Sequence, residues 1–186
     1  MTNIIKTERL ILRPLTLADA DAAYYGWTGD PEVAKYVSWL PHHSINETIE
    51  WLKEVKWEQD DTGNIIPNNN YIWGFVLKET SELFGSGGLI WEKNWQLFQV
   101  GYNIKKTHWN HGYTTEAMRS ILKFAAEKIG IKKVAGATRE RISHLLKCLR
   151  NWALFMTETT LHPMLMQCHE LKKIMVVDCG LVCSSS

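Results

Sequence analysis

The alternation of apolar and polar positions predicts a chain of short strands and helices. Alternating or continuous apolar runs predict strands over residues 10–13, 71–78, 83–91, 96–104 and 132–138. Apolar residues at helical spacing, each set preceded by a capping residue or a glycine, predict helices over 16–27, 31–37, 45–58 and 113–129. From residue 71 onward an antiparallel meander leads into a strand–helix–strand unit, whose two strands should be parallel neighbours. The pattern predicts an α/β (α+β) fold, a twisted, mixed and mostly antiparallel sheet flanked by helices.

The segment between the last two predicted strands contains the most informative motif, WNHGYTTEA at residues 109–117. A loop centred on Gly112 passes directly into a helix that Gly130 would end. The first N–H groups of such a helix and the positive end of its dipole suit a phosphate group, and a glycine allows close approach. An ordinary turn is the alternative for the motif alone. The strand–loop–helix–strand context favours the anion loop.

These residues resemble a known family. GYNI at residues 101–104, followed by the loop, resembles the coenzyme A loop of the GNAT N-acetyltransferases. The branch of ribosomal-protein-alanine N-acetyltransferases, whose loop commonly reads WGxGYATEA, is the most similar. TERLILRPL at residues 7–15 resembles the first strand of that branch, and the likeness covers about residues 5–138. Asn110 stands where the family often has Gly, and Thr114 where it often has Ala.

The resemblance implies acetyl transfer from acetyl-CoA, the co-substrate, to a primary amine by direct attack in a ternary complex. The acceptor is left open between a protein N-terminus, such as that of a ribosomal protein, and a small amine. The two parallel strands should splay after Ile104, where the backbone would bind the pantetheine arm. The predicted coenzyme-binding residues are Asn103, Ile104, Asn110, His111, Gly112, Tyr113, Thr114 and Thr115.

The catalytic groups are less well marked. Glu92, at the end of a predicted strand, is the predicted base that deprotonates the amine, with a solvated turn residue as the alternative. The resemblance places the general acid, a Ser or a Tyr, in the final third of the chain. His42 and His43, in a loop near the expected acceptor side, stay unassigned.

Composition sets wider bounds. A chain of 186 residues with 45% apolar residues fits one globular domain, and its net charge of +1 gives no support for binding nucleic acid or a membrane surface. The first residues show no apolar leader and no run approaches a membrane span, so a cytoplasmic protein is expected. The nine Trp residues are expected mainly in the core, with a substrate groove built from Trp39 and Trp91 as the alternative. Assembly into a homo-oligomer is left open.

The last part of the chain departs from the family pattern. After residue 138 the family would continue with ENxxS, a helix, KLGF and two strands. Codons for residues 140–146 and 146–156 can be chosen so that a shifted frame gives NIASI and then KVLEKLGFVY. We therefore expect an acetyltransferase-like core over 1–138, followed by a frameshift product over 139–186. The native coding DNA tests this hypothesis, which fails if the second frame cannot be read in this way.

A genuine, divergent C-terminus is the competing interpretation. An apolar stripe predicts a helix over about 140–156 in either case, and residues 173–177 could form a strand. The four cysteines all lie after residue 138 without paired zinc spacing, so free thiols are favoured and no metal is expected. Loss of the family's last third would leave a catalytically impaired CoA-binding or interaction protein. A nucleotide-phosphate binder that shares only the loop is a third alternative.

Overall fold

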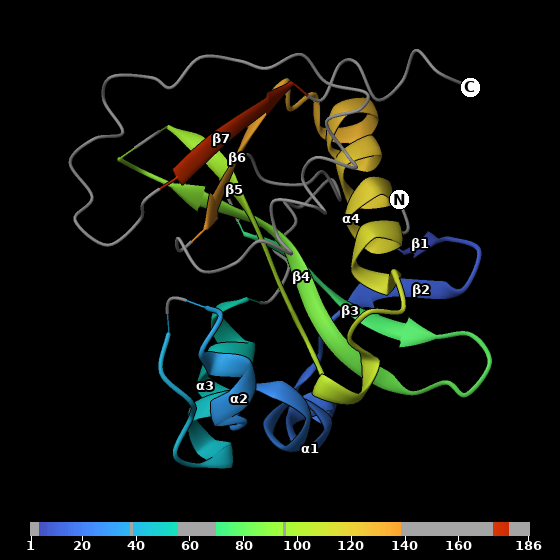
Figure 1. The fold of residues 1–186 in the computed structure, drawn as a ribbon, viewed down its shortest axis with the longest axis vertical. Helices are drawn as coiled ribbons and strands as arrows, with labels where there is room; N and C mark the ends of the chain where they lie inside the picture. Colours follow the sequence, from blue (N-terminus) through green and yellow to red (C-terminus); the bar gives the residue numbers. More distant parts are fainter. Residues whose placement is uncertain (1–3, 38, 56–69, 95, 139–172, 179–186) are drawn as a thin grey trace, which may run out of the picture.

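The computed structural model describes residues 4–37, 39–55, 70–94, 96–138 and 173–178. Its centre is a seven-stranded sheet whose strands lie in the order of the sequence (Figure 1). The strands are β1 (Ile5–Lys6), β2 (Leu10–Pro14), β3 (Tyr71–Leu77), β4 (Leu83–Glu92), β5 (Leu97–Ile104), β6 (Lys133–Thr138) and β7 (Lys173–Asp178). Each neighbouring pair is antiparallel except β5 and β6, which are parallel. This confirms the predicted mixed sheet and its one predicted parallel pair.

The helix predicted over 16–27 is divided into three short pieces. A 3-10 turn (Leu17–Asp19) is followed by α1 (Ala20–Ala23) and a π-helical turn (Tyr24–Thr28). Asp19 Oδ2 accepts hydrogen bonds from the backbone N–H of Thr16 at 2.8 Å and from its hydroxyl at 3.0 Å. Arg13 of β2 donates to both Asp19 oxygens, at 2.7 and 2.8 Å. These bonds fix the start of the helical segment to the sheet.

The other helices begin where the sequence predicted, although the one after Asp30 ends three residues before the predicted residue 37. α2 (Pro31–Ala34) begins after Asp30, whose side chain caps it by accepting from a first-turn N–H, and α3 covers Ile45–Glu54. α4 (Tyr113–Phe124) continues as a π-helical turn (Ala125–Ile129). Gly130 ends it in the left-handed conformation, with φ of 78°, as the sequence predicted.

Different helices cover the two faces of the sheet (Figure 1). α4 packs on one face, where its buried residues Met118 and Ile121 join a cluster that includes Trp73 and Phe98. The segments between β2 and β3 pack on the other face, in a second cluster that includes Trp27, Leu52 and Ile72. The sheet therefore separates two apolar layers, and β3 contributes to both, with Trp73 on the α4 side and Ile72 on the other.

The glycines of β4 allow close approach of the backbone, as the sequence suggested. A Cβ atom at Gly88 would collide with the carbonyl oxygen of Tyr71 on β3. The pairing of β3 with β4 also shifts register between Phe75 and Val76. Side chains are thus excluded from part of β4, and the strand is irregular near Gly85.

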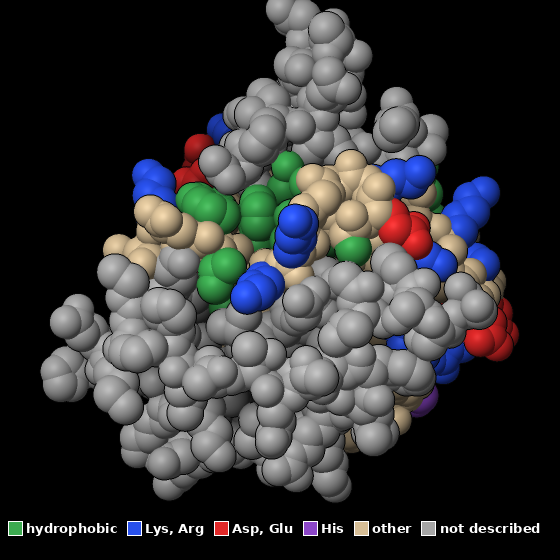
Figure 2. Space-filling view, turned by 90° about the horizontal axis from the view of Figure 1, so that it is seen from above, with side chains coloured by type: hydrophobic (Ala, Val, Ile, Leu, Met, Phe, Trp, Pro, Cys, Tyr) green, Lys and Arg blue, Asp and Glu red, His purple; other side chains and the backbone are tan. Residues whose placement is uncertain are grey.

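The C-terminal predictions are described only in part. The predicted helix over 140–156 and the four cysteines lie outside the described residues. The strand suggested over 173–177 is present as β7, which pairs with β6 from Lys133 to Thr138. No helix in the described ranges is long and apolar enough to cross a membrane. Figure 2 shows both basic and acidic side chains on the described part of one face, in keeping with the net charge of +1.

Candidate active site

The parallel pairing between β5 and β6 is shorter than the strands themselves. β6 pairs with Phe98, Gln99 and Val100, whereas β4 pairs with β5 from Leu97 to Ile104. Ala137 and Thr138, the last residues of β6, pair with β7 but not with β5. The two parallel strands therefore separate after Val100, at Gly101, which is four residues before the separation after Ile104 that the sequence indicated. The end of β5 that leads into the loop before α4 borders this opening.

The direction of the peptide groups decides which residues face the opening. Lys105 N donates to the carbonyl oxygen of Phe84 at 2.8 Å, so the carbonyl of Ile104 in the same peptide points away from β4. The alternation along a strand then turns the backbone groups of Asn103 toward β4 and the N–H of Ile104 away from it. The Ile104 carbonyl accepts from Trp109 Nε1 at 3.1 Å. Of the two residues predicted to contact pantetheine, Ile104 thus has its backbone N–H turned away from β4, whereas the backbone groups of Asn103 face β4.

The side chain of Asn103 is anchored on the face that α1 and α3 cover. Ser86 is 1% exposed, and its hydroxyl donates to Asn103 Oδ1 at 3.1 Å. In the next row of the sheet Gly88 lies opposite Gly101. Neither residue of this pair carries a side chain, and at Gly88 the place of a Cβ atom is filled by the carbonyl oxygen of Tyr71.

The loop between β5 and α4 has the backbone geometry expected of an anion loop. A 3-10 turn (Lys106–His108) precedes two left-handed residues, Asn110 with φ of 64° and Gly112 with φ of 76°. Asn adopts this conformation more readily than most residues, which explains how Asn110 can stand where Gly is common. Gly112 is the N-cap of α4 and supplies no side-chain acceptor to its first turn. An external anion can take that place.

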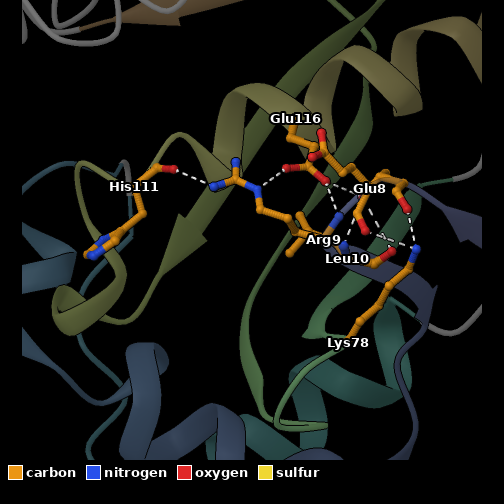
Figure 3. A network of polar contacts seen from close by, with 7 residues as sticks. Glu8, Arg9, Leu10, Lys78, His111 and Glu116 are labelled. Atoms are coloured by element: carbon orange, nitrogen blue, oxygen red, sulfur yellow. Dashed lines mark hydrogen bonds and ion pairs between the residues drawn. The ribbon is translucent and has the colours of Figure 1, made fainter.

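Glu116, in the first turn of α4, accepts three hydrogen bonds from the segment around β2 (Figure 3). The Thr7 hydroxyl donates to Oε1 at 2.5 Å, the Arg9 backbone N–H donates to Oε1 at 2.7 Å, and Arg9 Nε donates to Oε2 at 2.7 Å. Burial would raise the pKa of Glu116, but the hydrogen bonds from Thr7 and Arg9 outweigh it and hold the pKa below its ordinary value. Glu116 is therefore ionised near neutral pH.

Basic side chains surround the loop, and several already have acidic partners. Lys105 Nζ lies 2.7 Å from Glu82 Oε1, and Lys106 Nζ lies 3.6 Å from Glu32 Oε2. His108 Nε2 lies 3.5 Å from the second oxygen of Glu82. Burial lowers the pKa of His108 more than Glu82 raises it, so this imidazole is largely neutral at pH 7. An anion at this loop would therefore be held more by backbone N–H donors than by these basic side chains.

Glu92 lies at the hairpin end of β4, away from the loop that precedes α4. Its Oε1 accepts from the backbone N–H of Asn94 at 3.0 Å, and its partner across the ladder is Leu97. Gly88, which lies opposite the start of the opening, is four positions before Glu92 in β4. This distance is about 13 Å along a strand. A carboxylate at this distance can act on a substrate amine only through water. The role of Glu92 as base stays a prediction.

A chain of hydrogen bonds, not foreseen from the sequence, fixes His42 on the α1–α3 side. His42 Nδ1 lies 2.8 Å from Thr48 Oγ1, and Thr48 Oγ1 lies 2.7 Å from Thr28 Oγ1. The Thr28 hydroxyl also reaches the carbonyl oxygen of Ala23 at 3.3 Å. If the Thr28 hydroxyl donates to that carbonyl, the Thr48 hydroxyl must donate to Thr28 Oγ1. His42 Nδ1 must then be protonated, because it has to donate to Thr48 Oγ1. Burial lowers the pKa of His42, which favours its neutral form.

The two tryptophans of the suggested groove belong to different surroundings. Trp39 packs near His42, with ring centres 5.7 Å apart. Trp91 packs against Phe98, with ring centres 5.0 Å apart, on the α4 side of the sheet. An aromatic substrate groove that combines Trp39 and Trp91 is therefore wrong. Within the described residues no group of three or more His, Cys, Asp or Glu side chains is arranged to hold a metal ion.

Comparison with known proteins shows which family this chain resembles in sequence. The family model described as "Acetyltransferase (GNAT) domain" matches residues 9–141. The uncharacterized N-acetyltransferase p20 of Bacillus licheniformis is 25% identical over 147 residues, 78% of each chain. The uncharacterized N-acetyltransferase YoaA of Bacillus subtilis (strain 168) is 26% identical over 136 residues, 72% of each chain.

Solved structures share the fold at lower identity. An acetyltransferase from Agrobacterium tumefaciens str. C58 has a TM-score of 0.71 at 20% identity, covering 96% of this chain and 94% of the other. A Vibrio cholerae protein provisionally named a ribosomal-protein-serine acetyltransferase has a TM-score of 0.66 at 20% identity, covering 96% and 98%. The family match spans the opening in the sheet, the loop and α4, so the chain belongs to the GNAT acetyltransferase family, which uses acetyl-CoA as co-substrate.

Proposed function

We propose that this protein transfers the acetyl group of acetyl-CoA directly to a primary amine in a ternary complex. The observation that carries the proposal is the separation of β5 from β6 at Gly101, directly before the loop that ends at Gly112. An extended backbone edge and a helix N-terminus thus follow each other in the chain. The first suits the amide groups of a pantetheine arm, and the second suits a diphosphate.

The residues that could hold the co-substrate lie in that order. The Ile104 N–H turns toward the opening and offers a donor to pantetheine. Beyond it, the backbone of Asn110, His111, Gly112, Tyr113, Thr114 and Thr115 forms the predicted diphosphate loop. Preorganised backbone donors bind a charged group without the cost of ordering side chains.

The transfer itself needs few protein groups. The amine lone pair forms a bond to the thioester carbonyl carbon, the carbon–sulfur bond breaks, and sulfur leaves with that electron pair. One proton passes from the amine to a base, and one proton is delivered to the departing thiolate. Holding both substrates in one site supplies much of the rate.

The acceptor is a protein N-terminus or a small amine. The provisional name of the Vibrio cholerae neighbour is a reason to test N-terminal peptides of ribosomal proteins first. We would measure release of free CoA from acetyl-CoA with such peptides, polyamines, aminoglycosides and amino-acid analogues, and identify the products by mass. An acetylated amine formed in equal amount to CoA supports the proposal. CoA binding without turnover on this panel would favour a non-catalytic binding protein, and equal competition by ATP would favour a nucleotide-phosphate binder.

Glu92→Gln tests the predicted base. If the amine proton leaves through Glu92 and water, we expect kcat to fall about a hundredfold while the KM for acetyl-CoA stays unchanged, because general bases contribute about that much. Glu79→Gln, an exposed carboxylate at the β3–β4 turn, is the matched control. A pH–rate profile with each variant completes the test. A Glu92→Gln enzyme with the wild-type rate and profile would remove Glu92 from the mechanism.

A further inference from the structure

Arg9, in the turn between β1 and β2, contacts the loop that precedes α4 (Figure 3). Its Nε holds Glu116, as described above, and its Nη1 donates to the backbone carbonyl of His111 at 3.0 Å. The guanidinium also lies over the ring of Tyr113, with 4.5 Å between its central carbon and the ring centre. One side chain therefore contacts the loop, the first residue of α4 and the first-turn carboxylate.

The bond to His111 has a consequence for the neighbouring residue. The His111 carbonyl and the Gly112 N–H belong to one trans peptide, so they point in opposite directions. Holding the carbonyl toward Arg9 therefore turns the Gly112 N–H the other way. Gly112 itself has no side chain that could fix its orientation. Glycine can also adopt many backbone conformations besides the left-handed one found here.

We propose that Arg9 and Glu116 are positioning residues for the diphosphate loop, which they hold in the conformation that presents its N–H groups to the coenzyme. This inference rests on the proposed function of residues 110–115. It also gives a role to the TERL motif at residues 7–10, which the sequence resemblance left without one. Thr7 and Arg9 supply the three bonds that keep the Glu116 carboxylate in place.

Only an arginine can hold both partners at once. Its planar fork presents Nε and Nη1 in fixed, different directions, one to Glu116 Oε2 and the other to His111 O. Lysine keeps the charge but has a single nitrogen at the end of a flexible chain. Arg9→Lys should therefore release the His111 carbonyl or the carboxylate. Glu116→Gln keeps the side-chain shape but sets an amide N–H2 or an uncharged oxygen against the guanidinium.

The test compares two acetyl donors. S-acetylpantetheine carries the thioester and the pantetheine arm but has no diphosphate. For Arg9→Lys and Glu116→Gln we expect the KM for acetyl-CoA to rise about tenfold, the effect of weakening one hydrogen bond to a charged group. We expect kcat, and the KM for S-acetylpantetheine, to stay within about twofold of wild type. Calorimetry with CoA gives the same comparison without catalysis.

Asp19→Asn is the matched control, because Asp19 forms a comparable pair with Arg13 of β2, the strand that follows Arg9. It should lower the thermal midpoint without changing either KM. The positioning role is overturned if both Arg9→Lys and Glu116→Gln bind CoA like wild type. It is equally overturned if these variants raise the KM for acetyl-CoA and the KM for S-acetylpantetheine by the same factor. A third contrary result would be an Asp19→Asn variant that loses as much thermal midpoint and shows the same rise in the KM for acetyl-CoA. A wild-type protein that does not bind CoA would overturn the proposed function as well, whereas the other outcomes leave that function intact.

Discussion

Gly112→Val is expected to raise the dissociation constant of CoA by about a hundredfold. Gly112 has φ of 76°, a conformation that a β-branched residue rarely adopts, so the loop must change shape to accept valine. The methyl groups of valine would also extend from a Cβ position that lies 3.6 Å from Arg9 Nη2. Losing one or two hydrogen bonds to a phosphate corresponds to about 3 kcal/mol, or a hundredfold in affinity. Calorimetry measures this directly.

Gly130→Val is the control for backbone strain. Gly130 lies at the other end of the same helical segment with φ of 78°, and a Cβ atom there would have no neighbour within 4 Å. Both variants should therefore lose a similar amount of stability, about 1 kcal/mol or more, from the left-handed conformation. Only Gly112→Val should lose CoA affinity. Equal affinities for the two variants would place the diphosphate site elsewhere in the protein.

Restoring the shifted reading frame from residue 139 onward is expected to raise the acetylation rate by about a hundredfold or more. The frameshift is our proposal from the sequence. In the resembled family the Asn, Ser and Tyr positions of the final third follow this point, and one of them protonates the leaving thiolate. General acid catalysis contributes an effect of this size. The loop and α4 precede residue 139, so we expect similar CoA affinity in both chains.

The two chains would be expressed in parallel and compared in thermal midpoint, CoA affinity and acetylation rate. The restored chain should also have the higher midpoint, because the family's last two strands would extend the sheet beyond β7, the one strand that follows β6 in the described residues, and would cover more apolar surface. Equal rates and equal stability would identify residues 139–186 as a competent C-terminus. Sequencing the native gene provides an independent check on the second frame.

The sequence predicted the regular elements well where local pattern determines them. The strands from Tyr71 to Ile104 are bounded by turn residues and buried on at least one side, so their apolar positions are conspicuous. α4 has a clear apolar face and a glycine at each end. β1 was missed because two residues carry no periodicity. The helix predicted over 16–27 appeared continuous because turns of different pitch present similar spacing over so few residues.

The sequence could propose the candidate site only where it is continuous in the chain. The loop from Asn110 to Thr115 is a local motif, and the structure places left-handed residues at Asn110 and Gly112 in it. The bonds that hold Glu116 join residues 107 and 109 positions apart, and a single sequence carries no record of such pairing. The direction of the Asn103 backbone follows from its register with Ser86, which residue types do not reveal. His42 was indistinguishable from an exposed loop histidine until Thr48 and Thr28 were placed beside it.

The separation of Arg9 from Glu116 also has a consequence for the order of folding. The 107 positions between them mean that ribosomes, which add about 5–20 residues per second, make Glu116 several seconds after Arg9. During that interval the Glu116 carboxylate is not yet available to Thr7 and Arg9. Contacts of such long range form late, after local hairpins such as β4–β5. The coenzyme loop would therefore reach its final shape at the end of folding, and coenzyme added to a refolding chain should not accelerate the earlier steps.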